Sequence, residues 1–518
     1  MAAHLRSMAA VAVSTLGSRL LGLLRDMLLF AVLGAGALSS AFLIAFTIPN
    51  LFRRLLGEGA LTSAFVPVMT EATEAEGKER GFLFLNRVLT RLLGLLLVLV
   101  VLLAVGYLLL ALFPLEGERW DLAKHFGPLL APYLALVCLA AVLGAALNVL
   151  GGFTLAALSA VWLNLSMIVA LGVFGYALGE TPEVRARWLC LGVLVGGVLQ
   201  VALPALALFR HGWRPRADVR GSEHLSELHR LFLPGLLGAG IVQINIAVSR
   251  LLAFGVSEAA VAQLYLANRL VELPMGLFAI AITTVAFPRI ARFQAQGNAE
   301  GVRQAYGEGV GLIHALTFPA AAGLFILAEP ILRTLFEWGR FDAADVEATA
   351  TLLRVFALTV PLYSLTSFCT RAFHAMKDTR FPVRVAFVAF VVNTAASLAL
   401  MGPLGALGLA LANLLSVLLQ VILLGEGLMK RIPQASRLSQ LRGLLPIVAA
   451  TATLALVACY GWLLLQNNIA DAKQAALAAV GGLIPLAATV YFAVLLALSP
   501  GFRRLLPALR RPARVKTP

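Results

Sequence analysis

Apolar stretches of about 20 residues recur along the whole length of this chain, and short polar stretches separate them. An α-helix of about 20 residues crosses the roughly 30 Å of hydrocarbon in a bilayer. A membrane-spanning barrel would instead show short segments of alternating polarity. Of the 518 residues, 60% are hydrophobic and 13% are charged, against about a quarter charged in a soluble domain. We therefore predict an all-α polytopic membrane protein.

The apolar stretches predict fourteen transmembrane helices. If the N-terminus is cytoplasmic, the loops and tails on that side carry 24 Lys and Arg residues, against 7 on the opposite side. This imbalance predicts an even number of crossings, with both termini in the cytoplasm. The predicted segments are residues 8–33, 38–68, 84–113, 128–150, 153–178, 187–210, 229–255, 260–288, 306–328, 346–372, 382–401, 403–429, 441–465 and 473–498.

The second part of the chain repeats features of the first part in the same order. Ser18-Arg19-Leu20-Leu21 recurs as Ser249-Arg250-Leu251-Leu252, and the stretch from Leu61 to Pro67 resembles the stretch from Ile282 to Pro288. These matches predict two parallel six-helix lobes followed by two C-terminal helices. We assign residues 1–218 to the N-lobe, 219–432 to the C-lobe, and 433–518 to the two added helices and a basic cytoplasmic tail.

Charged residues lie inside the first two predicted segments. Each Arg in hydrocarbon costs about 2.5–3.5 kcal/mol or more, so these side chains need a wet cavity or a partner. Arg19 and Asp26 are seven residues apart and share one helix face, whereas Arg25 lies about 100° around the helix. In the second segment, Pro49 predicts a kink just before Arg53.

The repeated half also places arginines within its helices. Arg250 lies deep in the seventh segment, and Arg269 shares a face with Glu272 in the eighth. Arginine suits phosphate because its planar fork donates two hydrogen bonds and stays charged. We therefore expect a substrate that carries a phosphate or pyrophosphate.

A structural role competes with substrate binding for some of these arginines. A membrane arginine can extend to the interface or pair with a nearby acid, as Arg54 can with Glu58 four residues on. The residues alone leave the roles of Arg54 and Arg250 open.

The motifs of several other protein classes do not occur in the sequence. The chain contains no nucleotide-binding loop, nucleophile elbow or cluster of metal-ligand spacing, so we expect no enzyme activity, cofactor or metal. The net charge of +15 follows from basic loops between apolar segments, so nucleic acid is not an expected partner. Four cysteines fall in or beside apolar stretches and give no sign of a redox role.

Several motifs resemble those of the MurJ (MviN) family of lipid II flippases, within the multidrug/oligosaccharidyl-lipid/polysaccharide exporter superfamily. The resemblance extends over nearly the whole chain. The matching residues are Leu16-Gly17-Ser18-Arg19, Arg25-Asp26, the stretch from Phe46 to Arg54, Glu58-Gly59-Ala60, Ala64-Phe65-Val66-Pro67, Asn268-Arg269-Leu270 with Glu272 and Pro274, the stretch from Leu335 to Phe341, and the stretch from Thr379 to Val383.

This resemblance implies a transporter that moves lipid II, an undecaprenyl-pyrophosphate-linked disaccharide peptide, from the inner to the outer leaflet by alternating access. Its two C-terminal helices would form a groove for the lipid tail. The resemblance also implies that the protein lies in the bacterial cytoplasmic (inner) membrane. We expect a functional monomer whose other contacts are membrane lipids. The implied substrate-binding residues, in a cavity between the lobes, are Arg19, Arg25, Asp26, Arg53, Glu58, Arg269 and Glu272.

The chain also departs from relatives in this family. Some relatives bind sodium through acids in the seventh, eleventh and twelfth segments, whereas this chain has Gln243, Asn245, Asn393 and Ser397 there. The sequence therefore leaves the coupling ion open. The alternative functions are a flippase for another polyprenyl-linked polysaccharide precursor and a multidrug antiporter of the same superfamily. Arginine-rich segments disfavour the antiporter, because cationic drugs require carboxylates.

Overall fold

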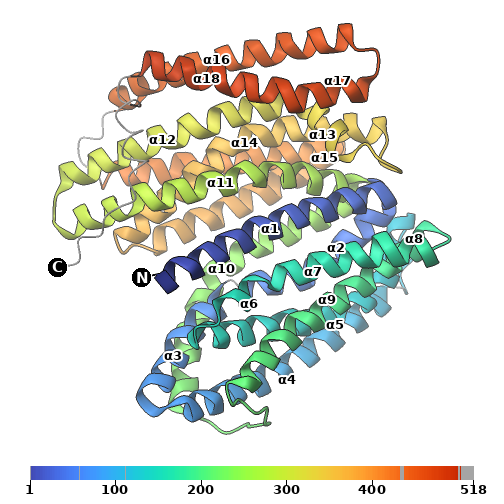
Figure 1. Cartoon of the computed structure of the whole chain (residues 1–518), viewed down its shortest axis with the longest axis vertical. Coiled ribbons are helices and arrows are strands. Elements are labelled where there is room, and N and C mark those ends of the chain that lie inside the picture. Colours follow the sequence, from blue (N-terminus) through green and yellow to red (C-terminus); the bar gives the residue numbers. More distant parts are fainter. Residues whose placement is uncertain (1, 58, 111, 432–436, 500–501, 503–518) are drawn as a thin grey trace. The chain divides into compact units, whose positions relative to one another are not determined.

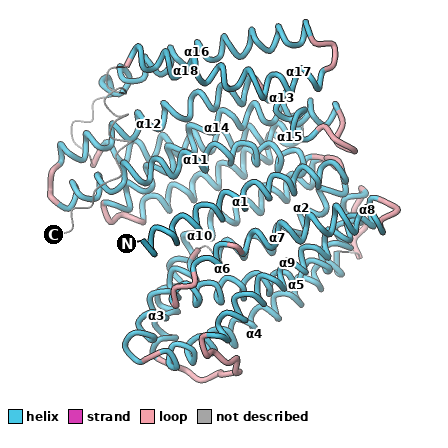
Figure 2. Tube along the Cα trace, viewed as in Figure 1, coloured by secondary structure: helices cyan, strands magenta, loops and turns pink. Residues whose placement is uncertain are grey.

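The computed structural model describes residues 2–57, 59–110, 112–431, 437–499 and 502. Within these residues the chain forms helices joined by loops, without a β-strand (Figure 2). The chain divides into two compact units, each considered by itself. Unit 1 comprises Met1–Ala262 and Trp338–Asp342, and unit 2 comprises Gln263–Glu337 and Ala343–Pro518.

Unit 1 is built from helices α1 to α10 (Figure 1). Helices α2, α5 and α9 pack on one another at its centre, α7 packs on α1 and α9, and α10 packs on α3. The elements are α1 (Ala2–Leu33), α2 (Ala37–Phe52), the π-helix η1 (Arg53–Gly57), α3 (Ala60–Glu76), α4 (Lys78–Leu110), α5 (Glu118–Val149), α6 (Phe153–Ala157), α7 (Ser159–Val169), the π-helix η2 (Ala170–Phe174), α8 (Gly175–Leu178), α9 (Pro182–Arg210) and α10 (Glu223–Val256).

Unit 2 contains nearly all of α11 and the helices that follow it. Helix α12 packs on α14 and α16, and α16 lies beside α18 (Figure 1). The elements are α11 (Ala260–Ala295), α12 (Ala299–Ile326), α13 (Ala328–Phe336), α14 (Ala343–Ala375), α15 (Arg380–Met429), α16 (Arg437–Asn468), α17 (Ala472–Ala478), the π-helix η3 (Ala479–Leu483) and α18 (Ile484–Leu498).

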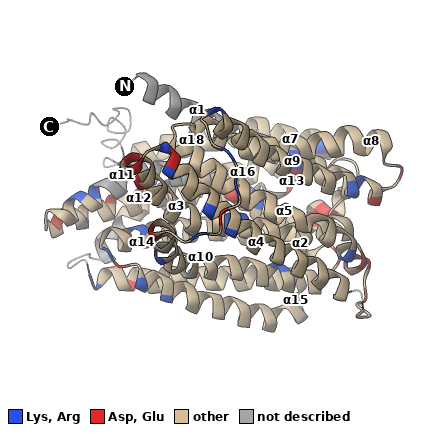
Figure 3. Ribbon diagram, turned by 90° about the horizontal axis from the view of Figure 1, so that it is seen from below, with Lys and Arg blue, Asp and Glu red and all other residues tan. Residues whose placement is uncertain are grey.

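The surface of these helices is that of a membrane protein. Helix α4 exposes a row of large apolar side chains, including Leu95, Val98, Val101 and Leu102, each more than half exposed. Charged residues form only small patches on a mostly uncharged ribbon (Figure 3). An apolar surface of this extent is stable when lipid covers it.

All fourteen predicted segments overlap helices, and the prediction of an all-α polytopic fold is confirmed. Within the described residues, nine helices are long and apolar enough to cross a membrane, or ten if the bent helix α10 counts as one span. Helix α15 combines the predicted segments 382–401 and 403–429, and its backbone breaks at Gly405, with φ 58° and ψ −135°. The number fourteen itself remains a prediction.

Two sequence predictions are not tested by the structure. Glu58 lies outside the described residues, as do the side chains from Ile282 to Pro288. The boundary between homologous lobes that we expect at residue 218 stays a prediction. It was placed from the sequence repeat, whereas the two units are defined by which residues pack together, and unit 1 includes α10.

Candidate functional site

Arg25 and Asp26 form an ion pair in the second half of α1. Arg25 Nε and Nη2 both donate to Asp26 Oδ1, at 3.0 and 2.5 Å. The Asp26 side chain is fully buried, and only 12% of the Arg25 side chain is exposed. Helix α1 continues through Gly22 without a break. The Arg25 guanidinium therefore reaches Asp26 through the conformation of its own side chain and without a bend in the helix. The pairing offsets part of the cost of removing both charges from water.

Asn164 on α7 holds the same arginine from a second helix. Arg25 Nη1 donates to Asn164 Oδ1 at 3.0 Å, and Asn164 Nδ2 donates to the Ser18 carbonyl oxygen at 3.2 Å. Asn164 is 7% exposed, so its amide has to find protein partners. Its side chain therefore connects Arg25 to the backbone of α1 about two turns earlier.

Arg53 lies where α2 passes into the π-helix η1. Its Nε donates to Asn50 Oδ1 at 2.9 Å, one turn earlier. Pro49 removes one backbone donor from this turn, and the winding changes from α to π four residues later, whereas the kink expected there stays a prediction. Arg53 is therefore the first residue of the π-helix, four residues after the proline.

Tyr133 on α5 lies within the electrostatic influence of both arginines. Its hydroxyl is fully buried and donates to Gln200 Oε1 on α9 at 3.2 Å, and its ring stacks on Phe46 with centroids 5.6 Å apart. Arg25 and Arg53 therefore approach the same part of unit 1 from α1 and η1.

Arg250 has a polar partner in unit 1. Its Nη1 donates to the Thr47 hydroxyl at 2.8 Å, and that hydroxyl in turn donates to the Leu43 carbonyl at 2.6 Å. This contact joins α10 to α2. The sequence left the role of Arg250 open, and the structure gives it a contact that supports helix packing.

Unit 2 carries a second group of polar residues on α11. Arg269 Nη1 lies 3.2 Å from Glu272 Oε2, and Asn268 Nδ2 donates to Glu272 Oε1 at 3.3 Å. A quarter of the Arg269 side chain is exposed, twice the fraction for Arg25. Tyr363 on α14, which donates to Asn413 on α15 at 3.0 Å, lies within electrostatic range of Glu272.

Arg19 and Arg54 are the remaining arginines of the first two predicted segments. Arg19 and Arg54 are half-buried, and within the described part of the chain neither makes a hydrogen bond or ion pair with a protein group. Their predicted roles stay predictions, as does that of Glu58.

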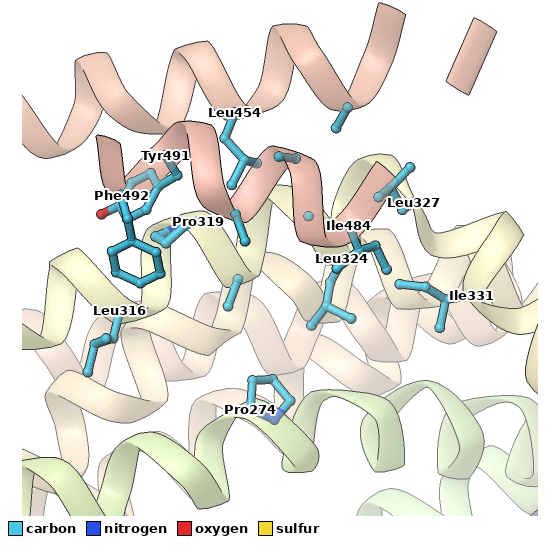
Figure 4. A pocket seen from close by; sticks show the side chains of 15 residues that line it. Pro274, Leu316, Pro319, Leu324, Leu327, Ile331, Leu454, Ile484, Tyr491 and Phe492 are labelled. Carbon is cyan, nitrogen blue, oxygen red and sulfur yellow. The ribbon is translucent and has the colours of Figure 1, made fainter. Parts of the chain in front are cut away.

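An apolar cavity of about 360 Å³ lies in unit 2, among α11, α12, α13, α16 and α18 (Figure 4). Leu316 and Leu324 of α12 line it, together with Leu454 of α16 and Tyr491 and Phe492 of α18. Tyr491 is fixed there because its hydroxyl donates to the Ala315 carbonyl at 2.6 Å. The lining suits a hydrocarbon chain and offers little to a charged group.

The sequence reasoning missed the partners Asn164, Tyr133 and Tyr363. Each is a polar residue inside an apolar segment, which is the one signal that could have drawn attention to it. Among the described residues, no three His, Cys, Asp or Glu side chains come together as metal ligands.

A family model described as "Lipid II flippase MurJ" matches residues 29–474. The chain is 33% identical over 506 residues to the "Probable lipid II flippase MurJ" of Rhizobium meliloti, covering 94% of this chain and 93% of that protein. It is also 33% identical over 446 residues to the protein of the same name from Bdellovibrio bacteriovorus, with 84% of each covered.

Two kinds of solved structure share the fold. "Lipid II flippase MurJ, inward closed conformation" superposes with a TM-score of 0.77 and 24% identity, over 96% of this chain and 99% of that chain. An inward-facing multidrug resistance transporter of the MATE family superposes with a TM-score of 0.63 and 18% identity, over 80% and 94%. At these identities the superpositions establish the fold.

Proposed function

The chain belongs to the lipid II flippase MurJ family, and from this membership we propose that it carries lipid II from the inner to the outer leaflet of the bacterial cytoplasmic membrane. Such a protein is a transporter, with no chemical step on its substrate. Alternating access fits this activity, and the MATE transporters that share the fold belong to the same superfamily.

The observation that carries the proposal is that two half-buried arginines of unit 1, Arg25 and Arg53, both act electrostatically on the buried Tyr133. The head group of lipid II holds a pyrophosphate, and guanidinium groups bind phosphate oxygens through paired, charge-assisted hydrogen bonds. We propose that Arg25, Arg53 and Arg269 bind the pyrophosphate. By family resemblance, Arg19 and Glu58 complete the set.

We propose that Asp26 and Glu272, which the family resemblance places in the same substrate-binding set, act through the arginines that they contact. Asp26 and Glu272 each lie on the same helix as the arginine they contact. A membrane-embedded arginine without a partner would be costly, so the acid stabilises it when no substrate is bound. We propose that the pyrophosphate competes with these carboxylates for guanidinium hydrogen bonds, which lets the substrate bind and leave.

The cavity among α12, α16 and α18 supports a separate role for the last two spans. Its apolar lining would accommodate part of the polyprenyl tail while the head group is held elsewhere. We propose this role for residues 433–518. We also propose that both termini are cytoplasmic and that the monomer is functional.

Complementation tests the function. A bacterium depleted of its own lipid II flippase receives the wild-type chain, Arg25→Ala, Arg269→Ala or the control Arg230→Ala, whose side chain is 78% exposed. Growth and lipid II accessible at the outer leaflet are measured. We expect wild type and Arg230→Ala to rescue. Because Arg25→Ala and Arg269→Ala each remove charged hydrogen bonds, we expect at least about a tenfold loss of flipping for each.

Membrane levels of each variant are measured alongside. Rescue by Arg25→Ala and Arg269→Ala at wild-type rates would show that these arginines do not bind substrate. Failure of well-expressed wild type to rescue would contradict the proposed function itself and favour another polyprenyl-linked substrate.

A further inference from the structure

Asn164 contacts the Arg25 guanidinium and is assigned no role by the proposed function. Its Oδ1 accepts from Arg25 Nη1 at 3.0 Å, on the opposite side of the guanidinium from the Nε donor that contacts Asp26. We propose that Asn164 is a positioning residue for head-group binding, which orients Arg25 toward the pyrophosphate. This inference rests on the proposed function.

The geometry supports an orienting role. An arginine side chain has many rotamers, and one contact to an adjacent residue leaves several of them available. Asn164 comes from a different helix, so its bond fixes the guanidinium relative to α7 as well as α1. Its own orientation is fixed in turn, because Nδ2 donates to the Ser18 carbonyl at 3.2 Å.

The chemical type of the residue matters as much as its position. An amide oxygen accepts a hydrogen bond without adding charge. Asp26 already places one negative charge beside Arg25. With a second carboxylate at position 164, Arg25 and its two acidic partners together would carry a net charge of −1, which would repel an incoming phosphate. An amide therefore orients Arg25 while leaving its attraction for an anion intact.

The competing explanation is that Asn164 merely joins α1 to α7. Asn86 on α4 provides a matched control for such a structural role. It is 5% exposed, its Nδ2 donates to the Arg214 carbonyl at 2.9 Å, and its Oδ1 accepts from Trp213 Nε1 at 2.9 Å. Asn86 thus makes the same two kinds of bond from a buried site without contacting an arginine side chain of the proposed binding set.

The test measures lipid II binding to purified full-length protein in detergent, together with thermal unfolding. The variants are Asn164→Leu, Asn164→Asp, Asn86→Leu and Arg25→Ala, alone and combined with Asn164→Leu. We expect Asn164→Leu to weaken binding about tenfold in the wild-type background and to have no further effect beside Arg25→Ala. Asn86→Leu lowers the unfolding temperature but leaves the affinity of the folded protein unchanged.

Asn164→Asp has the same size as the native residue and carries the test if Asn164→Leu does not fold. It is expected to weaken binding at least tenfold, most strongly at low salt. Wild-type affinity in either Asn164 variant, or an equal loss with and without Arg25, would overturn the inference. Absence of lipid II binding by wild type would overturn the proposed function as well. If wild type binds lipid II and the Asn164 variants bind it equally well, only the role of Asn164 is overturned.

Discussion

Arg25 and Arg269 lie in different units, yet their surroundings are chemically alike. Each contacts a carboxylate on its own helix, Asp26 in one case and Glu272 in the other. In both places an asparagine belongs to the same hydrogen-bonded group. An acid and an amide can hold an arginine in an apolar surrounding while leaving a cation that an anion can still bind.

The close approach of Gly339 to α1 makes a residue-scale prediction for stability. Gly339 has φ +60°, and a Cβ there would overlap the Ala31 carbonyl oxygen, beside the bond from Arg340 N to that oxygen at 2.8 Å. We expect Gly339→Ala to destabilise the protein by more than the roughly 1–2 kcal/mol that a left-handed backbone alone costs. Thermal unfolding in detergent measures the effect.

Gly297→Ala is the matched control for this substitution. Its φ is +65°, and no atom lies within 4 Å of the position its Cβ would take. It therefore carries only the backbone cost. Equal shifts in unfolding temperature for the two variants would show that the contact with Ala31 contributes nothing.

At the scale of elements, helix α15 is a hairpin of two helices whose ends meet at one aspartate. Asp378 precedes α15 and accepts hydrogen bonds from the backbone N–H groups of Arg380 and Phe381, at 3.0 and 3.1 Å. Arg431, just after α15, donates to the other Asp378 oxygen at 2.5 Å and lies over the ring of Phe381. The break at Gly405 allows the chain to return to this point.

These bonds predict a pH dependence for the α15 hairpin. The Phe381 N–H and then the Arg431 guanidinium hold the pKa of Asp378 below its ordinary value of 3.8. A depressed pKa contributes stability above the ordinary value, and that stability is lost as the pH falls through the folded-state pKa. We expect Asp378→Asn to lower the unfolding temperature at pH 7, by an amount that shrinks below about pH 4.

Arg431→Gln provides the comparison for Asp378→Asn. In the Arg431→Gln protein, Asp378 has lost its ion pair. Adding Asp378→Asn to that protein should therefore lower the unfolding temperature at pH 7 by less than it does in the wild type. An effect of Asp378→Asn that is the same at pH 7 and at pH 3.5 would rule out a role for the ionised carboxylate.

On the scale of the whole molecule, the sequence predicted the helices well and their polar contacts poorly. Each of the fourteen predicted apolar stretches overlaps a helix, because the bilayer demands that pattern, whereas the short helix α13 was not predicted. The contact of Asn164 with Arg25 was not predicted because the two residues are 139 positions apart, and Thr47 lies 203 positions from Arg250. Such pairs depend on which helices pack together, and apolar periodicity does not specify the neighbours of a helix.

The topology of the whole chain yields the last prediction. The excess of Lys and Arg on one set of loops predicts that Lys78 is cytoplasmic and Glu180 faces the opposite side. Lys78 is the exposed first residue of α4, and Glu180 is exposed in the short connection between α8 and α9. A membrane-impermeant maleimide added to spheroplasts should therefore label Glu180→Cys and leave Lys78→Cys unlabelled until the membrane is permeabilised.

The native cysteines allow a clean background for this experiment. Cys138, Cys190 and Cys369 are buried, and only the exposed Cys459 of the four needs replacement by serine. The labelling reports the side of the membrane directly, because the reagent reaches one face of the bilayer. Labelling of Lys78→Cys before permeabilisation, with Glu180→Cys protected, would invert the orientation. The proposed direction of transport would then have to be assigned anew relative to the arginines of α1 and α11.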